Sequence, residues 1–333
     1  MTSETQPRNA RQLGIVGLGR MGGNLAAQAL EKGLDVVGHD PHAAPHELRH
    51  AGLRLADKLS ALCEALEPPR LVLLYVPAGP VVDKVLDEVA QQLEPGDVLA
   101  DGGNSYWRDS QARARRLAAK GVAFLDVGTS GGLDGARHGA CFMVGGESQA
   151  VAAAEPLLRT LAVPDGFVHA GRSGAGHLAK LVHNGIEFGM LQALGEGLAL
   201  LEAYQGEIPL DISQVLRSWR HGSVIRSWLV DLLHAAYEAH GDKLGEIPSY
   251  VEDTGEVNRL VSDALELEQP IPVISQSVMQ LFASRDEQRN WARAIALMRH
   301  AFGGHPYGAD PRIRDERHSG RVNVPEYSSA SPS

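Results

Sequence analysis

Hydrophobic residues in the first half of the chain alternate between short continuous runs and stretches with helical spacing. The runs predict buried strands, because short apolar segments between turn residues are typical of a parallel sheet. The predicted strands are Leu13–Val16, Asp35–Gly38, Leu71–Val76, Asp97–Ala100, Ala123–Val127 and Ala140–Val144. A helix is predicted over Met21–Lys32 and ends before Gly33. Strands that alternate with helices indicate a mostly parallel sheet covered on both faces.

The pattern changes after about Gly171, where apolar positions recur at helical spacing and no strand-like run interrupts them. The predicted helices are Gly174–Gln205, Leu210–His221, Ser227–His240, Thr254–Leu267 and Arg285–Phe302. The second half is therefore predicted to be all-helical. Residues 1–11 and 315–333 are polar and patternless, so we expect a flexible arm and a flexible tail.

Composition narrows the class of protein. A chain of 333 residues suits two domains, and 44% hydrophobic with 22% charged residues is typical of a globular protein. The formal net charge of -10 argues against a nucleic-acid or membrane-surface partner, which would require a basic face. A small anionic substrate remains open, because cations clustered in one cleft can override the overall sign.

Cysteine and histidine usage adds two expectations. Two cysteines, Cys63 and Cys141, without a signal-peptide pattern indicate a reducing, cytoplasmic location and give no disulfide framework. The longest apolar run, Leu71–Val76, is too short to span a bilayer. His46 and His50 have the spacing of helical zinc ligands, but no HExxH motif and no cysteine or carboxylate cluster accompanies them. We therefore predict a surface pair and no metal cofactor.

A glycine motif follows the first predicted strand and opens the first predicted helix. It reads Gly17-Leu18-Gly19-Arg20-Met21-Gly22. In such a motif the first glycine permits a tight turn, the second lets the backbone approach a pyrophosphate, and the third lets the helix pack on the strand. The helix N-terminus then binds phosphate. In this context the motif predicts an α/β Rossmann-type dinucleotide-binding domain over residues 12–171, followed by an all-α C-terminal domain over residues 172–314.

Asp40 follows the second predicted strand, 23 residues after Gly17. At this position a carboxylate accepts hydrogen bonds from both ribose hydroxyls and repels a 2′-phosphate. Pro41 follows it, where an NADP enzyme would favour an arginine. The sequence therefore predicts NAD in preference to NADP, with NADP possible. The alternative is that Asp40 only caps a loop.

Four polar residues lie on one face of the predicted helix after Gly174. At roughly 100° per residue, Lys180, His183, Asn184 and Glu187 fall within a stripe of about 100°. Burying them among apolar neighbours would be costly without ligands or partners. The glycines of this stretch weaken helix propensity, as close packing against a cofactor or strand would require. An exposed amphipathic face is the alternative to a catalytic one.

Four segments in this order and spacing resemble decarboxylating 6-phosphogluconate dehydrogenase, in particular its short, often NAD-linked branch in the β-hydroxyacid dehydrogenase superfamily. The resemblance runs from about Leu13 to His305, and its most specific part is the helix that carries Lys180. The segments are Asp101-Gly-Gly-Asn-Ser105, Gly128-Thr-Ser-Gly-Gly-Leu-Asp-Gly-Ala-Arg137, Gly174-Ala-Gly-His-Leu-Ala-Lys-Leu-Val-His-Asn-Gly-Ile-Glu187 and Phe302-Gly-Gly-His305.

The resemblance implies a role for each matching residue. Lys180 would take the proton of the substrate's C3 hydroxyl, which requires that its pKa be lowered. After loss of CO2, Glu187 would protonate C1 of the enediol and give the ketopentose. The remaining implied contacts are Ser130, Gly131 and Gly132 to the substrate carboxylate, Asn104, His183 and Asn184 to its carboxylate or hydroxyls, and Val76, Pro77 and Asn104 to the dinucleotide.

Phosphate recognition departs from the family pattern. Arg299 and His305 fit the pair that the neighbouring chain contributes, which implies a homodimer or homotetramer. After Gly255 the family commonly has Gly-x-Gly, a basic residue and Trp-Thr, whereas this chain has Gly255-Glu-Val-Asn-Arg-Leu260. Phe188 also stands where a tyrosine often follows the catalytic glutamate. Two alternatives remain: Arg259, Arg285, Arg299 and His305 bind the phosphate, or the true substrate lacks it.

Two rival functions share parts of this pattern. A β-hydroxyacid dehydrogenase of the 3-hydroxyisobutyrate type has the glycine motif and the spacing of Lys180 and Asn184, and it would act on an unphosphorylated sugar acid or a 3-hydroxy acid. Its usual Asp-x-Ser-Thr differs from the segment at Asp101. A non-catalytic nicotinamide-binding regulator would keep the fold. The presence of both Lys180 and Glu187 favours an enzyme.

Overall fold

A computed structural model describes residues 11–42, 46–311 and 314 of the chain. The chain divides into two compact units, one formed by Met1–Pro248 with Glu252–Gln280 and the other by Ser249–Val251 with Leu281–Ser333. This division follows packing, and the predicted domain boundary near residue 171 stays a prediction. The predicted arm and tail lie outside the described residues, except for Arg11, whose guanidinium donates to the Gly33 carbonyl at 3.0 Å.

The first unit contains an eight-stranded sheet with the strand order β3-β2-β1-β4-β5-β6-β7-β8. The strands are β1 (Gln12–Val16), β2 (Asp35–His39), β3 (Arg54–Leu55), β4 (Leu71–Leu74), β5 (Val98–Asp101), β6 (Ala123–Ser130), β7 (Ala140–Gly145) and β8 (Ala162–Gly171). All neighbouring pairs are parallel except β6 and β7. The order reverses between β1 and β4, and in open α/β sheets ligands bind beyond the carboxyl ends of the strands at such a point.

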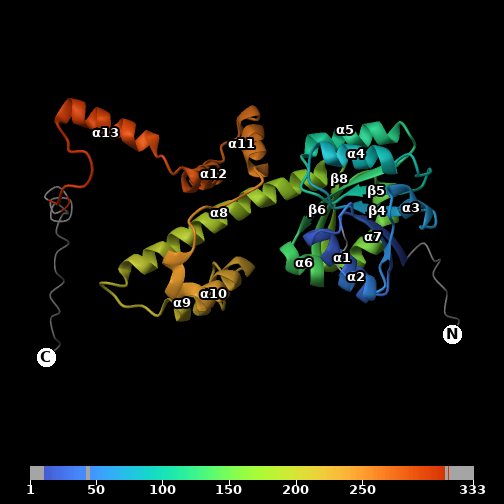
Figure 1. Cartoon of the computed structure of the whole chain (residues 1–333), viewed down its shortest axis with the longest axis horizontal. Helices are drawn as coiled ribbons and strands as arrows, with labels where there is room; N and C mark the ends of the chain where they lie inside the picture. The colour runs from blue at the N-terminus through green and yellow to red at the C-terminus, as the bar shows by residue number, and fades with distance from the viewer. Residues whose placement is uncertain (1–10, 43–45, 312–313, 315–333) are drawn as a thin grey trace. The chain divides into compact units, whose positions relative to one another are not determined.

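Helices cover both faces of the sheet, with α4 and α5 on one face and α1, α6 and α7 on the other (Figure 1). The helices of this part are α1 (Arg20–Glu31), α2 (His46–His50), α3 (Leu59–Glu64), α4 (Pro80–Val89), α5 (Trp107–Ala118), α6 (Gly132–His138) and α7 (Ser148–Leu161). Each face has its own buried core. Neighbours Ile15 and Val16 of β1 belong to different cores, because successive side chains of a strand point to opposite faces.

Strand β8 is absent from the sequence-based prediction, as is the two-residue β3. Pro164 and Gly166 interrupt the apolar run of β8, and Asp165 between them has a φ of 61°. The pairing of β8 with β7 also contains register shifts. Such an edge strand lacks the continuous hydrophobic pattern that identifies a buried one.

Helices alone follow β8 in the part of the chain that the structure describes. In the first unit they are α8 (Ala175–Tyr204), α9 (Ile212–Trp219), α10 (Trp228–His240), the 3-10 helix η2 (Gly241–Glu246), α11 (Glu256–Glu266) and most of α12 (Pro272–Arg285). Leu181 of α8 packs with Val257 and Leu260 of α11, and Leu198 packs with residues of α9. The predicted fold class, a parallel α/β domain followed by an all-helical one, is confirmed.

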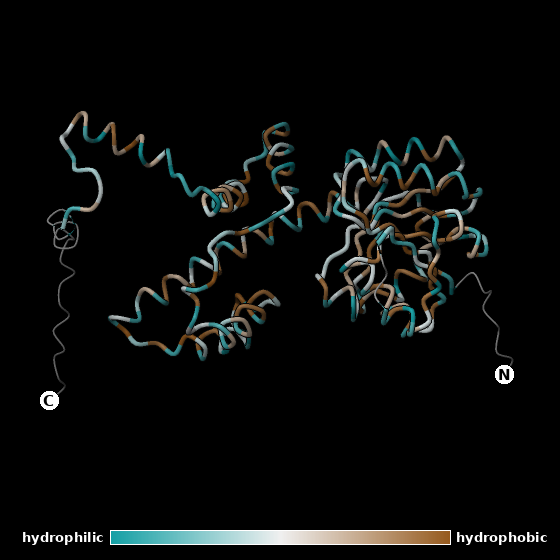
Figure 2. The backbone as a smooth tube through the Cα atoms, in the orientation of Figure 1, coloured by the Kyte–Doolittle hydropathy of each residue, from teal (hydrophilic) through white to brown (hydrophobic). Residues whose placement is uncertain are grey.

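The second unit contains α13 (Asn290–Gly303), and the predicted helix Arg285–Phe302 is wrong at its start. The structure places Arg285 at the end of α12 and turns the chain at Arg289, which has a φ of 48° and donates its N–H to Asp286 Oδ1 at 2.9 Å. No residue of α13 is buried. Hydrophobic segments nevertheless recur along this helix, as they do along the strands of the first unit (Figure 2).

None of the helices in the described ranges, α8 with its 30 residues included, has both the length and the hydrophobicity needed to cross a bilayer.

Candidate active site

The glycine turn, residues 17–22, joins β1 to α1 at the reversal point of the sheet. Gly17 has a φ of 90°, and a Cβ on it would lie 2.3 Å from the Tyr75 carbonyl oxygen. A Cβ on Gly22 would lie 1.9 Å from the Gly17 carbonyl oxygen, so both positions exclude a side chain. A Cβ on Gly19 would meet no protein atom within 4 Å. The turn therefore fits a dinucleotide. Gly17 and Gly22 close the turn, and Gly19 leaves its backbone open to a pyrophosphate.

Asp40 lies at the same turn. Its Oδ2 accepts the Leu18 N–H at 2.7 Å and its Oδ1 accepts the His42 N–H at 2.8 Å. The second bond is the loop cap that the sequence left as an alternative, and the first holds the carboxylate against the glycine turn. Each oxygen keeps a further lone pair, so the cap and a ribose contact are compatible.

The ends of β4 and β5 form the next wall of this crevice. Val76 lies beside Gly17, because a Cβ on Gly17 would be 3.2 Å from its side chain. A Cβ on Gly103 would lie 3.1 Å from the Val76 carbonyl oxygen, which places the Asp101–Ser105 turn against the same residue. Pro77 and Asn104 are exposed here. These predicted cofactor contacts therefore lie near the glycine turn, with Asn104 available to a ligand.

A buried arginine supports the Asp101–Ser105 turn. Arg113 of α5 donates to Asp101 Oδ2 at 3.3 Å and to Ser105 Oγ at 3.0 Å, and it also pairs with Asp83 of α4 at 3.1 Å. Ser105 Oγ donates to Asp101 Oδ2 at 2.7 Å. Arg113 is almost completely buried, so its charge is compensated within the protein. The sequence pattern does not indicate this residue, because its partners come from other elements.

Helix α8 begins directly on the sheet. The buried Asp126 of β6 accepts the Gly174 N–H at 2.6 Å and the His177 N–H at 2.9 Å, which satisfies free donors of the helix N-terminus. A Cβ on Gly128 would lie 2.6 Å from the Lys180 Cβ. Glycine at position 128 therefore lets Lys180 lie against β6, next to the end of the strand at Ser130.

The polar face of α8 consists of Lys180, His183, Asn184 and Glu187. Lys180 Nζ lies 3.4 Å from His183 Nδ1, and His183 Nε2 lies 3.0 Å from Ser130 Oγ of β6. Glu187 Oε2 lies 3.8 Å from His183 Nδ1. The predicted stripe is thus a connected group that includes the start of the Ser130-Gly131-Gly132 turn. Gly131 and Gly132 have φ values of 113° and 59°, conformations that glycine adopts without strain.

The surroundings of Lys180 favour its neutral form. Burial lowers the pKa of the Lys180 ammonium below its ordinary value of 10.5, because a charged amine loses hydration there. The carboxylates of Glu187 and Glu256 and the thiol of Cys141 oppose this effect. The net direction is downward, as a lysine that removes protons requires.

The four basic residues predicted to bind phosphate fall in different parts of the molecule. Arg259 of α11 belongs to the first unit, where it lies 3.8 Å from Asp109 Oδ2 and above the Tyr106 ring. Arg285, Arg299 and His305 belong to the second unit. Arg285 Nε donates to the Val251 carbonyl oxygen at 2.5 Å, Arg299 is exposed, and His305 contacts the Phe302 ring. Of the four, only Arg259 belongs to the first unit, and the contacts found for it are with α5 and not with the polar face of α8.

Three residues that the sequence analysis missed lie at this site. Glu256, the first residue of α11, accepts from Asn184 Nδ2 at 3.3 Å. Cys141 pairs in register with Ser130 across β6 and β7 and interacts with Lys180. The Trp228 ring would lie 3.8 Å from a Cβ on Gly132. Only Cys141 had a local signal, because it follows the predicted Gly-rich turn on the next strand.

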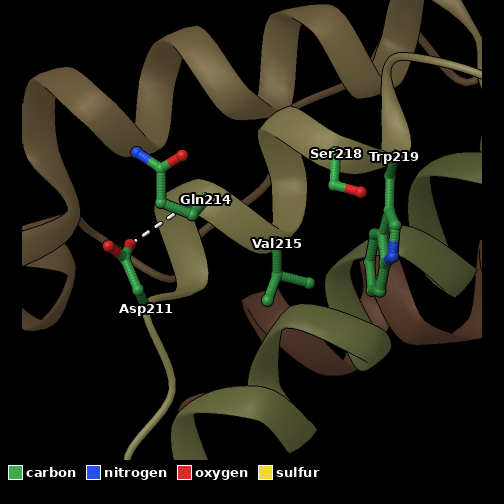
Figure 3. A pocket seen from close by; sticks show the side chains of 5 residues that line it. All are labelled: Asp211, Gln214, Val215, Ser218 and Trp219. Atoms are coloured by element: carbon green, nitrogen blue, oxygen red, sulfur yellow. Dashed lines mark hydrogen bonds between the residues drawn. The ribbon is translucent and has the colours of Figure 1, made fainter.

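Two pockets lie away from this group. One of about 410 Å³ is lined by Asp211, Gln214, Val215, Ser218 and Trp219 of α9 and its cap (Figure 3). Asp211 is occupied as the N-cap that accepts the Gln214 N–H at 3.0 Å, and no buried polar group points into the pocket. The other, of about 320 Å³, lies between α5 and α11 at Tyr106, Asp109, Arg259 and Ser262. Neither pocket is lined by Lys180.

No group of three or more histidine, cysteine, aspartate or glutamate side chains among the described residues is arranged to hold a metal ion.

The glycine turn with Asp40 beside it and a lysine of lowered pKa on a helix against the sheet are typical of a nicotinamide-dependent dehydrogenase. Residues 12–171 match the NAD binding domain of 6-phosphogluconate dehydrogenase, and residues 176–302 match the C-terminal domain of 6-phosphogluconate dehydrogenase. The chain belongs to the 6-phosphogluconate dehydrogenase family. The resemblance expected from the sequence is thereby confirmed.

Individual relatives agree with this assignment. The chain is 41% identical to the Bacillus subtilis protein YqeC, over 88% of this chain and 98% of that protein. It is 40% identical to the NAD(+)-dependent, decarboxylating 6-phosphogluconate dehydrogenase of Haloferax volcanii, over 88% of this chain and 97% of that protein. The Plasmodium falciparum 6-phosphogluconate dehydrogenase structure superposes with a TM-score of 0.73 at 25% identity and covers 92% of this chain and 68% of its own.

The fold is also shared with the rival enzyme class. A 3-hydroxyisobutyrate dehydrogenase from Salmonella typhimurium superposes with a TM-score of 0.67 at 24% identity, over 83% of this chain and 95% of its own. At that identity the likeness concerns the fold alone.

Proposed function

We propose that this chain catalyses the oxidative decarboxylation of 6-phosphogluconate to ribulose 5-phosphate and CO2, with NAD as the preferred electron acceptor. The observation that carries the proposal is the polar face of α8, where a half-buried Lys180 of lowered pKa contacts His183, which in turn contacts Ser130. The NAD-dependent decarboxylating relative at 40% identity supports the substrate and the cofactor.

The dinucleotide is bound by the backbone of the glycine turn, residues 17–22, with Val76, Pro77 and Asn104 along the crevice. When bound, NAD supplies the acceptor for the hydride that leaves C3 of the substrate. Asp40 Oδ2 is held against the turn by Leu18, so a carboxylate faces the position of the ribose hydroxyls. A 2′-phosphate there would meet like charge, which supports NAD over NADP.

Lys180 Nζ accepts the proton of the C3 hydroxyl, and C3 becomes a ketone. The product is a β-keto acid, in which the electrons of the C1–C2 bond can pass into the carbonyl as CO2 leaves. Lys180, now protonated, returns a proton to the enolate oxygen. Its lowered pKa suits the first step, because a less basic ammonium leaves more of the neutral amine to accept the proton, and the protonated amine is then a stronger acid for the second step.

Glu187 delivers the last proton, to the carbon that lost CO2, which completes the ketopentose. It lies one turn beyond His183 on the same face of α8, about 3.8 Å from its ring nitrogen. Ser130, Gly131 and Gly132 hold the substrate carboxylate, with a hydroxyl and a Gly-rich turn that offers N–H donors. Asn104, His183 and Asn184 bind its carboxylate or hydroxyls.

Phosphate binding and assembly are linked in this proposal. Arg259, Arg285, Arg299 and His305 provide the cations, with Arg299 and His305 contributed by a neighbouring copy of the chain in a homodimer or homotetramer. The exposed stripe of Trp291, Ile295, Met298 and Phe302 on α13 supports such an assembly, because isolated apolar helix faces are uncommon on monomers. Sedimentation of a monomer at micromolar concentration would contradict it.

A kinetic panel tests the function. 6-Phosphogluconate, gluconate and 3-hydroxyisobutyrate are each assayed with NAD and with NADP, with CO2 measured beside the reduced dinucleotide. We expect the highest kcat/KM for 6-phosphogluconate with NAD, and one CO2 for each NADH. A higher kcat/KM for gluconate would show that the phosphate is not part of the substrate. Oxidation without CO2 would assign the chain to the β-hydroxyacid dehydrogenases instead.

A further inference from the structure

Glu256 is the carboxylate of the site to which the proposed reaction gives no role. It begins α11 after Gly255, whose φ is 74°. Its Oε1 accepts from Asn184 Nδ2 at 3.3 Å, and its Oε2 accepts from Thr254 Oγ1 at 2.5 Å. The carboxylate thus contacts the polar face of α8 through a single residue, Asn184.

The packing of α11 on α8 fixes the position of Glu256. Val257 and Leu260 of α11 form a buried cluster with Leu181 of α8. A Cβ on Gly185 would lie 2.5 Å from Leu260 Cδ2, so the two helices approach at van der Waals distance there. A carboxylate on such a rigid contact can orient its partner, because little conformational freedom is left to lose.

The orientation of the Asn184 carboxamide follows from its contact with this carboxylate. The amide nitrogen must face Glu256, because a carboxylate only accepts hydrogen bonds. Asn184 is buried, and its Oδ1 therefore faces His183 Nδ1, at 3.2 Å. An amide oxygen also only accepts, so His183 Nδ1 carries the ring proton.

The position of that proton decides which form of Lys180 fits. Lys180 Nζ lies 3.4 Å from the same Nδ1. The Nδ1–H already faces Asn184 Oδ1 at 3.2 Å, and a neutral amine can share it as a second acceptor, whereas Nδ1 offers no acceptor to an ammonium group. In neutral His183, Nε2 is then the acceptor for the Ser130 hydroxyl at 3.0 Å.

We propose that Glu256 is a positioning residue, which fixes the Asn184 carboxamide and through it the Nδ1–H tautomer of His183, so that the site accommodates Lys180 as a neutral amine. The role rests on the proposed function of Lys180 as a base. Glu256 acts on Lys180 also through its charge, and in the opposite direction, because a negative charge favours the ammonium form. A test must therefore separate the position of the side chain from its charge.

The pair Glu256→Gln and Glu256→Ala makes this separation. Both variants lose the charge, but glutamine keeps an oxygen that accepts from Asn184. We expect Glu256→Gln to lower kcat by about threefold at most, and Glu256→Ala to lower it by about tenfold, as loss of one hydrogen bond to a charged group implies. The acidic limb of the kcat/KM profile should lie at higher pH in Glu256→Ala than in Glu256→Gln. In the alanine variant Asn184 and His183 are free to reorient, so His183 Nδ1 becomes an acceptor for the lysine ammonium.

The pH profile has a limited set of contributors. The titratable groups that face Lys180 in the described part of the chain are His183 and Glu187 of α8, Cys141 of β7 and Glu256 of α11. The two variants share all of these except residue 256. Glu266→Ala is the matched control, because it removes an exposed carboxylate from the other end of α11, where the partner is Arg108. We expect Glu266→Ala to leave both kcat and the acidic limb of the kcat/KM profile unchanged.

Nitrogen-15 NMR of the histidine rings reads the tautomer directly, in protein without substrate or dinucleotide. The His183 signals are identified by their loss in His183→Gln. We expect the Nδ1–H form in the wild type and in Glu256→Gln, and a shift toward the Nε2–H form in Glu256→Ala. An unchanged tautomer in Glu256→Ala, or a kcat loss in Glu256→Gln as large as in Glu256→Ala, overturns the proposal. A tautomer shift in a protein that does not oxidise 6-phosphogluconate would leave this role intact and refute only the proposed function.

Discussion

The glycine turn and the polar face of α8 bind their ligands by different means. In the turn, the groups offered to a ligand are the backbone N–H groups after Leu18, since those of Gly17 and Leu18 are already donated to the His39 carbonyl and to Asp40. Side chains matter there chiefly by their absence at Gly17 and Gly22. On α8, the groups to which we assign the chemistry are side chains, and their partners Ser130 and Glu256 come from other elements. A backbone site tolerates changes in charge but not in volume, whereas a side-chain site depends on the proton and charge state of each member.

The largest expected effect comes from Lys180→Met. The substitution removes the proposed base while it keeps a flexible apolar side chain against Gly128. We expect kcat to fall about a thousandfold, within the range that general acid–base groups contribute. NAD affinity should change little, because the proposed dinucleotide contacts come from the glycine turn, which the substitution leaves intact. Steady-state kinetics measure kcat and a dinucleotide titration measures NAD affinity. Lys84→Met, at an exposed position of α4, is the control.

The direction in which Lys180→Met changes the stability of the fold follows from the pKa of Lys180. Burial lowers the pKa of Lys180 in the folded protein below 10.5, so the folded state holds this proton less tightly than the unfolded chain does. The charged amine therefore costs stability below the lowered pKa, and the cost disappears as the pH rises through it toward 10.5. At neutral pH the methionine variant should unfold at the same temperature as the wild type or above it. A lower unfolding temperature would show that the lysine is instead stabilised where it lies.

Sequence spacing predicts the local part of this site well. Lys180, His183, Asn184 and Glu187 share one helix, so their common face follows from helical geometry alone. The glycine turn is likewise contiguous, and its strand and helix context is visible in the hydrophobic pattern. The fold class follows from the same alternation of strands and helices, because buried parallel strands are nearly continuous apolar runs.

The parts of the site that the sequence does not predict depend on contacts between elements that lie far apart along the chain. Glu256 lies 72 residues from Asn184 and reaches it only because α11 packs on Gly185. Arg113 looks like one of several surface arginines of α5, yet it is buried against Asp101 and Asp83. Arg259 is paired with Asp109 of α5, a contact that spacing along the chain does not indicate.

A pair of alanine substitutions in the glycine turn gives the next largest effect. A Cβ on Gly22 would lie 1.9 Å from the Gly17 carbonyl oxygen, so Gly22→Ala should destabilise the fold by about 1–3 kcal/mol and abolish dinucleotide binding. A Cβ on Gly19 meets no protein atom within 4 Å, so Gly19→Ala should keep its stability and weaken NAD binding by about tenfold, where the pyrophosphate approaches. Thermal unfolding and NAD titration measure both. Equal NAD affinity in Gly19→Ala and the wild type would show that the pyrophosphate does not approach the backbone at this position.

The smallest effect concerns Asp40, the one side chain of the turn region to which we assign a charge-dependent role. Asp40→Asn keeps one side-chain oxygen that can accept from the N–H of Leu18 or of His42. It removes the charge that opposes a 2′-phosphate. Two charges about 4 Å apart in water interact by about 1 kcal/mol, so the ratio of kcat/KM with NAD to that with NADP should fall by roughly fivefold. Asp35→Asn, exposed at the start of β2, makes the same change in net charge and should leave the ratio unaltered. If both variants shift the ratio equally, overall charge and not the ribose contact sets the cofactor preference, and the turn would then select its ligand by backbone alone.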